Sequence, residues 1–276
     1  MNIRDSVIMI TGASSGIGEA TARAALQAGA RVILLARRKQ RIDALAETSV
    51  NALAVACDVT QADEIENAVR QGLARFGRID VLINNAGQGL FASVEEIDAA
   101  AFRALLDLNL IAPLMMMQAV IPQMREQGAG SIINVSSGAT LATYPGSAAY
   151  TSSKAGLNML SDVARLELAD AGITVSTIYP FVTASEFYQS VKSGQEVATE
   201  QSAAFAAFAH TPERVAETIL AVITSGEAQV DLVPRAYGGS DDGSDRAAVR
   251  RPGGVTQAIW LARGAVSGFI TSAEKT

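Results

Sequence analysis

The chain has 276 residues, of which 49% are hydrophobic and 18% are charged, and its formal net charge at pH 7 is −6. This composition can fill the core of one large domain, which argues against disorder, and the acidic balance without a basic stripe argues against nucleic acid as a partner. The single cysteine, Cys57, excludes an intramolecular disulfide, so we expect a reducing compartment and a cytoplasmic protein.

Short apolar runs alternate along the chain with longer segments of helical periodicity. The expected strands lie at residues 6–10, 31–35, 53–56, 81–84, 131–135, 174–178 and 230–233. The expected helices lie at residues 16–27, 40–47, 62–76, about 100–126, 148–170 and 213–224. The strands are almost continuously apolar, as in sheets covered on both faces. The βαβα order therefore predicts an α/β fold, with an open parallel sheet between two layers of helices.

A glycine-rich turn joins the first expected strand to the first expected helix. It begins at Thr11 as T-G-A-S-S-G-I-G, and its candidate phosphate-binding residues are Gly12, Ser14, Ser15, Gly16, Ile17 and Gly18. Glycines let the backbone approach a pyrophosphate, and a helix N-terminus adds free N–H groups and a favourable dipole. A simple tight turn is the alternative, because the glycine spacing differs from the general dinucleotide fingerprint.

The end of the second strand selects the cofactor in folds of this type. An acidic residue there binds the ribose 2′-hydroxyl of NAD, whereas an arginine accommodates the 2′-phosphate of NADP. Here Ala36 stands in the acidic position, and Arg37 and Arg38 follow it with guanidinium groups that can bind a phosphate bidentately. We therefore predict NADP(H); a solvated basic helix start is the alternative.

A tyrosine and a lysine stand four residues apart further along the chain. They are Tyr150 and Lys154, and Ser137 lies thirteen residues before the tyrosine. An i,i+4 pair lies on one face of a helix, where an ammonium group can lower a phenol pKa from its ordinary ~10. A nearby serine hydroxyl can bind a carbonyl or alcohol oxygen. These residues could transfer a proton beside a hydride carrier, although the Y-x-x-x-K pattern alone is common by chance.

Taken in order, these motifs resemble the short-chain dehydrogenase/reductase family. The resemblance covers roughly residues 5–235 and adds Asp58, an N-N-A-G turn from Asn84, Asn109, the pair Ser136-Ser137 and Pro180. It implies a doubly wound Rossmann fold of about seven parallel strands with helices on both faces. It also implies a homodimer or homotetramer that associates through the helices at about 100–126 and 148–170.

The resemblance also implies roles for individual residues. The catalytic tetrad would be Asn109, Ser137, Tyr150 and Lys154. In this tetrad Ser137 binds the substrate oxygen, Tyr150 donates the proton, Lys154 binds the nicotinamide ribose and lowers the tyrosine pKa, and Asn109 holds a water. Further cofactor contacts would come from Asp58, Val59, Asn85, Ala86, Gly87, Tyr150, Lys154, Pro180 and Thr183. Asn85 could instead stabilise the central strands, and Asn109 could be a buried amide. No metal-binding residue is predicted.

The segment after Pro180 departs from the family pattern. Phe181 stands where the family usually has glycine, and Ser185 stands where it has threonine. Residues from about 184 to 212 carry several aromatics among alanines, which predicts a mobile lid over an apolar substrate; simple packing of the aromatics is the alternative. Residues 1–235 would form one Rossmann domain that includes this lid. Residues 236–276 would form a loop-rich extension with a candidate short helix at 258–263.

The expected function is NADP(H)-dependent hydride transfer between the nicotinamide and a carbonyl or secondary alcohol, with a hydrophobic ketone or aldehyde as substrate. Two alternatives stay open: epimerisation or dehydration on the same fold, and a dinucleotide-binding regulator without turnover. No membrane partner is expected, because the apolar segment at 105–124 contains Asp107, Asn109 and Pro113 and is predicted to be a buried helix.

Overall fold

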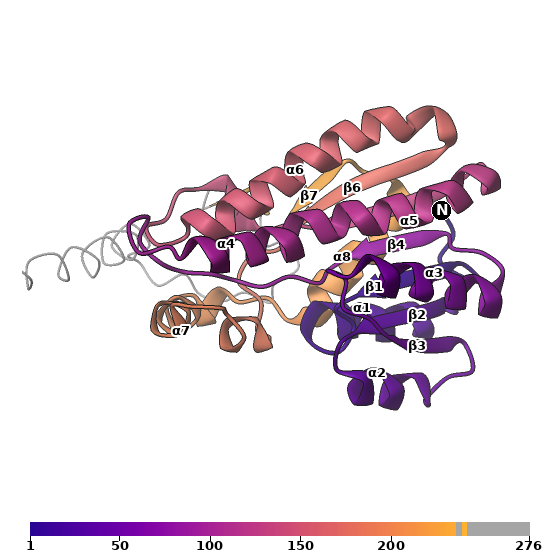
Figure 1. Cartoon of the computed structure of the whole chain (residues 1–276), viewed down its shortest axis with the longest axis horizontal. Helices are drawn as coiled ribbons and strands as arrows, with labels where there is room; N and C mark the ends of the chain where they lie inside the picture. Colours follow the sequence, from indigo (N-terminus) through magenta and orange to yellow (C-terminus); the bar gives the residue numbers. More distant parts are fainter. Residues whose placement is uncertain (236–238, 242–276) are drawn as a thin grey trace, which may run out of the picture.

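A computed structural model describes residues 1–235 and 239–241 of the chain (Figure 1). The predicted loop-rich extension at 236–276 lies almost entirely outside the described residues, and its candidate helix at 258–263 lies wholly outside them. The domain boundary at residue 235 therefore stays a prediction.

Seven parallel strands form one sheet in the order β3-β2-β1-β4-β5-β6-β7. The strands are β1 (Val7–Thr11), β2 (Arg31–Ala36), β3 (Ala52–Ala56), β4 (Val81–Asn84), β5 (Gly130–Val135), β6 (Ile173–Tyr179) and β7 (Gln229–Asp231). The strand order reverses between β1 and β4, so the carboxyl ends of these strands form the topological switch point where such sheets bind ligands. The predicted doubly wound fold is confirmed.

Helices cover both faces of this sheet. They are α1 (Gly16–Gln27), α2 (Lys39–Ala46), α3 (Ala62–Phe76), α4 (Ala99–Leu106), α5 (Ala112–Gln127), α6 (Ala148–Leu168), α7 (Gln195–Ala204) and α8 (Pro212–Ser225). Helices α3, α5 and α6 pack on one face, and α1, α2 and α8 pack on the other. Figure 1 shows α4 and α5 running beside α6 along one side of the molecule.

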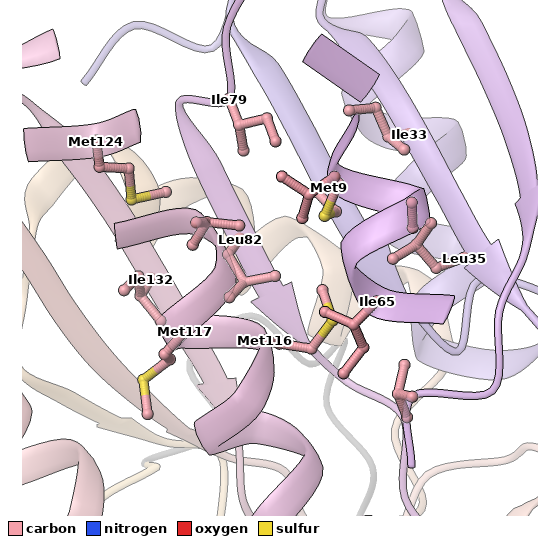
Figure 2. Close-up of a cluster of buried hydrophobic side chains, with 14 of the residues drawn as sticks. Met9, Ile33, Leu35, Ile65, Ile79, Leu82, Met116, Met117, Met124 and Ile132 are labelled. Carbon is pink, nitrogen blue, oxygen red and sulfur yellow. The ribbon is translucent and has the colours of Figure 1, made fainter. Parts of the chain in front are cut away.

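The alternation of side chains along each strand produces two separate cores. Met9 and its strand neighbours on one face join the cluster under α3 and α5, whereas Ile8 and Ile10 join the cluster under α1 and α8. Figure 2 shows the first cluster, in which Met116 and Met117 of α5 fill the space above the strands. Flexible methionine side chains suit such irregular gaps.

The predicted long helix at 100–126 is interrupted. A π-helical turn, Asp107–Ile111, separates α4 from α5 and contains Asn109. The stretch Ala99–Gln127 is long and apolar enough to cross a membrane by length and composition alone. The side chains of Met116, Met117 and Met124 are buried against the sheet, and 39% of the apolar window is buried inside the protein.

Candidate active site

The loop after β1 needs its glycines for backbone conformation and for close packing within the protein. Gly12 and Gly16 have φ values of 68° and 54°, which favour glycine. A Cβ at Gly18 would overlap the carbonyl oxygen of Gly12 and lie 2.5 Å from Nδ2 of Asn85. The N-cap residue of α1, Ser15, makes no side-chain capping bond, so the helix N-terminus offers its N–H groups to an anion. These features fit the pyrophosphate of a dinucleotide.

The turn after β4 is tied to this loop by hydrogen bonds. The backbone N–H groups of Asn85 and Ala86 both donate to Oγ1 of Thr11, at 2.9 and 3.0 Å. The Asn85 amide donates to the carbonyl of Thr11 at 2.9 Å. The structural role that the sequence left open for Asn85 is therefore present. Gly87 follows, and a Cβ there would lie 3.3 Å from Nζ of Lys154.

The four predicted catalytic residues come together from three elements. Tyr150 and Lys154 lie on α6, Ser137 follows β5, and Asn109 lies in the π-helical turn. Tyr150 and Ser137 share a side-chain hydrogen bond, and Nζ of Lys154 donates to the carbonyl of Val135 at 2.9 Å. Asn109 and Lys154 both lie close to Gly87, since a Cβ there would be 3.2 Å from Oδ1 of Asn109 and 3.3 Å from Nζ of Lys154.

Asn109 is fully buried, and its amide is engaged on both sides. Its Nδ2 donates to the carbonyl of Gln88 at 2.9 Å and to Oγ of Ser153 at 3.0 Å. Its Oδ1 accepts from the backbone N–H of Gln88 at 3.0 Å. The side chain therefore ties the π-helical turn and α6 to the segment after β4, which makes the buried-amide alternative a real part of its role. Water binding by Asn109 stays a prediction.

Burial favours the neutral form of both titrating groups of the site, so it shifts their pKa values in opposite directions. It raises the pKa of the Tyr150 phenol to about 12, and the hydrogen bond with Ser137 offsets part of this rise. It lowers the pKa of the Lys154 ammonium to about 8. The hydrogen bond with Ser137 opposes the larger effect of burial on the phenol pKa. The predicted lowering of this pKa by Lys154 stays a prediction.

Arginines gather at the other end of the site, beside the glycine-rich loop. The Arg38 guanidinium donates to Oγ of Ser14 at 3.0 and 3.1 Å and to Oγ of Ser15 at 2.7 Å. Arg41 of α2 lies beside them, and Arg37 is exposed. Sequence reasoning missed Arg41, although its position one helical turn after Arg38 is a signal that could have identified it.

The remaining predicted cofactor residues surround the same edge of the sheet. Asp58 follows β3, where its Oδ1 accepts from the N–H and hydroxyl of Thr60 at 3.0 and 2.8 Å, and Val59 is buried in the core. Pro180 follows β6, and its carbonyl accepts from the N–H of Gly138 at 2.9 Å. Thr183 is buried nearby. These positions agree with a cofactor lying across the carboxyl ends of the strands.

The departure at Phe181 is accommodated by the segment that follows it. The Phe181 ring lies 5.7 Å from the ring of Phe205 and 6.4 Å from that of His210. The chain beyond is partly helical, with short 3₁₀ turns and α7, which the sequence did not predict. The aromatic side chain in place of glycine thus packs against residues of the segment that is predicted to form a lid.

The same segment brings apolar rings to Tyr150. The Phe187 ring lies 5.7 Å from the tyrosine ring, and Phe91 lies 6.1 Å away on another side. Backbone hydrogen bonds from Lys192 to Gly89 and from Phe91 to Ser193 hold the lid against the segment after β4. The surroundings of the phenol are therefore largely apolar.

Comparison with known proteins agrees with this geometry. The family model for short chain dehydrogenase matches residues 6–196. An uncharacterized oxidoreductase of Listeria innocua is 32% identical over 233 residues, which cover 82% of this chain and 94% of that protein.

Two solved structures have the same fold. A 3-ketoacyl-(acyl-carrier-protein) reductase from Brucella melitensis, complexed with NADH, aligns with a TM-score of 0.76 at 26% identity, over 83% of this chain and 97% of that one. A short chain dehydrogenase/reductase from Burkholderia phymatum, in complex with NAD, aligns with a TM-score of 0.80 at 21% identity, over 85% and 91%. In the described residues, no group of three or more His, Cys, Asp or Glu side chains could hold a metal ion. The chain belongs to the short-chain dehydrogenase/reductase family, oxidoreductases that bind a nicotinamide dinucleotide and act on small-molecule substrates at CH–OH groups.

Proposed function

We propose that the protein is an NADP(H)-dependent oxidoreductase that interconverts a hydrophobic ketone or aldehyde and the corresponding alcohol. The observation that carries this proposal is the hydrogen bond between the buried Tyr150 and Ser137, with Lys154 one helical turn along the same helix. A proton donor and a group that can bind the substrate oxygen therefore lie side by side, next to a loop that fits a dinucleotide phosphate.

The residues divide the chemistry between them. The reduced nicotinamide, when bound, supplies the hydride. Ser137 holds the substrate oxygen, and Tyr150 donates its proton to that oxygen as negative charge develops on it. With a pKa of about 8, Lys154 is mostly protonated at pH 7, so it can bind the ribose and stabilise the phenolate that remains. In general, a charge ~5 Å from a phenolate, at an effective dielectric of ~20, stabilises the phenolate by about 3 kcal/mol.

The preference for NADP(H) rests on the arginines after β2. A guanidinium held by Ser14 and Ser15, with a second one from Arg41 nearby, presents several donors to a phosphate. The β2 end carries Ala36 where an acidic residue would favour NAD(H). The two solved structures named above hold NADH and NAD, which describes those proteins; our proposal for this chain depends on its own arginines.

The substrate class rests on the rings around the phenol. Phe91 and Phe187 flank Tyr150, and the lid beyond them is rich in alanine and phenylalanine. An apolar substrate would gain from burial against these rings, because apolar surface would be removed from water.

Self-association and location complete the proposal. Three large apolar side chains lie exposed on one side of α6: Met159, Val163 and Leu166, at 64%, 43% and 79% exposure. Because such a stripe is unfavourable in water, we propose that it packs in a homodimer or homotetramer. The single cysteine, Cys57, is free and buried, which supports a cytoplasmic location.

The test is turnover with and without the phenol hydroxyl. The wild-type protein, screened with NADPH against apolar ketones and aldehydes, should oxidise the cofactor, which absorbance follows. Tyr150→Phe should reduce kcat by at least about 10³-fold, because proton donation is lost, while NADPH binding persists. Retention of more than a small part of the rate in Tyr150→Phe would overturn the mechanism. NADPH binding without oxidation of any compound would favour the regulator instead.

A further inference from the structure

An acidic residue of the lid occupies the arginine cluster at the cofactor end of the site. Glu186 begins the 3₁₀ turn Glu186–Gln189, and both of its carboxylate oxygens are engaged. One accepts from Nη1 of Arg38 at 2.8 Å, and the other accepts from Nη1 of Arg41 at 2.7 Å. These are the guanidinium groups that our proposed function assigns to the 2′-phosphate. The carboxylate thus stands in the place of an anionic ligand.

The neighbours of Glu186 connect it to the rest of the site. Ser185, directly before it, lies against the glycine-rich loop, since a Cβ at Gly16 would be 3.1 Å from its Cβ. Phe187, directly after it, places its ring 5.7 Å from the ring of Tyr150. Three consecutive lid residues therefore span from the phosphate loop to the proposed proton donor. A change in the contacts of the Glu186 carboxylate is therefore expected to shift the lid residues that lie beside the Tyr150 phenol.

We propose that Glu186 is a specificity-determining residue for the cofactor, whose carboxylate neutralises Arg38 and Arg41 when no 2′-phosphate is present and competes with that phosphate when NADP(H) binds. The inference rests on the proposed function in assigning these arginines to the phosphate. A phosphate monoester carries nearly two negative charges at pH 7, so it repels a carboxylate on the same guanidinium groups. NADP(H) must therefore break both ion pairs, whereas NAD(H) can bind while they persist.

The size of the effect follows from the exposure of the pairs. The three side chains are between 42% and 48% exposed, so solvent screens each pair and each contributes only a few-fold to an equilibrium constant. Removal of the competing carboxylate should therefore tighten NADPH binding by about three- to tenfold. The affinity for NADH should stay the same or fall, because its complex loses the neutralising charge.

The experiment compares cofactor affinities in three proteins: the wild type, Glu186→Gln, and Glu196→Gln as a control. Glu196 is exposed in the first turn of α7, so its replacement removes the same charge from the lid at a different point. NADPH and NADH are titrated by fluorescence at two salt concentrations, and adenosine 2′,5′-bisphosphate serves as a phosphate probe without nicotinamide. Circular dichroism checks that each variant is folded.

The expected result is a threefold or larger rise in the ratio of NADPH to NADH affinity in Glu186→Gln, with no change in Glu196→Gln. The probe should bind Glu186→Gln more tightly as well. An unchanged ratio in a folded Glu186→Gln protein would overturn the inference. The proposed function is judged separately, on the wild type: if it binds NADH at least as tightly as NADPH, the NADP(H) preference fails, whatever Glu186→Gln does to the ratio.

Discussion

We predict that the buried Lys154 ammonium destabilises the folded protein at neutral pH, so that its replacement makes the protein more stable. Its side chain is 4% exposed, and burial lowers the pKa of its ammonium from 10.5 to about 8. At about 1.4 kcal/mol per pH unit, this difference corresponds to roughly 3 kcal/mol of unfolding free energy. Lys154→Met keeps the length without the charge but loses the hydrogen bond to Val135, so we expect a gain of about 1–3 kcal/mol at pH 7.

The pH dependence tests the cause. The pKa of Lys154 is lower in the folded protein than in the unfolded chain, so between pH 8 and 10.5 the unfolded chain holds a proton that the folded protein has lost. The unfavourable contribution of Lys154 to wild-type stability therefore decreases with pH through this window as the burial penalty disappears. The advantage of Lys154→Met should be fully present below pH 8 and should decrease by roughly 2 kcal/mol between pH 7 and pH 10.

Urea unfolding followed by circular dichroism at pH 7 and pH 10 measures both effects. Lys192→Met is the matched control, because Lys192 is an exposed lysine of the lid and its replacement should change little. Lys154→Met should also lose turnover, so that stability and activity change in opposite directions. The reasoning is refuted if Lys154→Met is no more stable than the wild type at pH 7, or if its advantage is the same at pH 10.

Two further predictions concern the cofactor loop and the position of Ser137. Gly18→Ala should weaken NADPH binding about tenfold or more in a fluorescence titration, because the new methyl group would overlap the backbone of Gly12. Gly72→Ala is the control, since its methyl group would meet the tip of the Ile33 side chain and should leave NADPH binding unchanged. Asn158→Ala should lower kcat about tenfold or more with unchanged NADPH affinity. The Asn158 amide accepts a hydrogen bond from the hydroxyl of Ser136 and donates one to the hydroxyl of Thr140, so its loss should displace Ser137, which lies between them. Equal NADPH affinity in both glycine variants, or an unaltered kcat in Asn158→Ala, would contradict these expectations.

The strands and most helices were predictable because their signals are local. A strand covered on both faces must be apolar throughout, so β1 was expected at 6–10 and lies at Val7–Thr11. The glycine-rich turn, the turn from Asn84 and Ser137 were predictable for a related reason: each follows a strand at its carboxyl end, and parallel strands bring these ends to one edge of the sheet. The weakest signal was in the lid, where α7 has no strong apolar face and so was not predicted.

The sequence by itself determined the fold class, the reaction type that the residues can support and the identity of the candidate site residues, because periodicity, glycine positions and motif order are properties of the chain. Only the tertiary structure decided how those residues are held. It revealed the π-helical turn that buries Asn109, the hydrogen bond between Tyr150 and Ser137, and the contact of Glu186 with Arg38. These features depend on groups distant in sequence: Glu186 and Arg38 are 148 residues apart, and no local pattern encodes a contact at that separation.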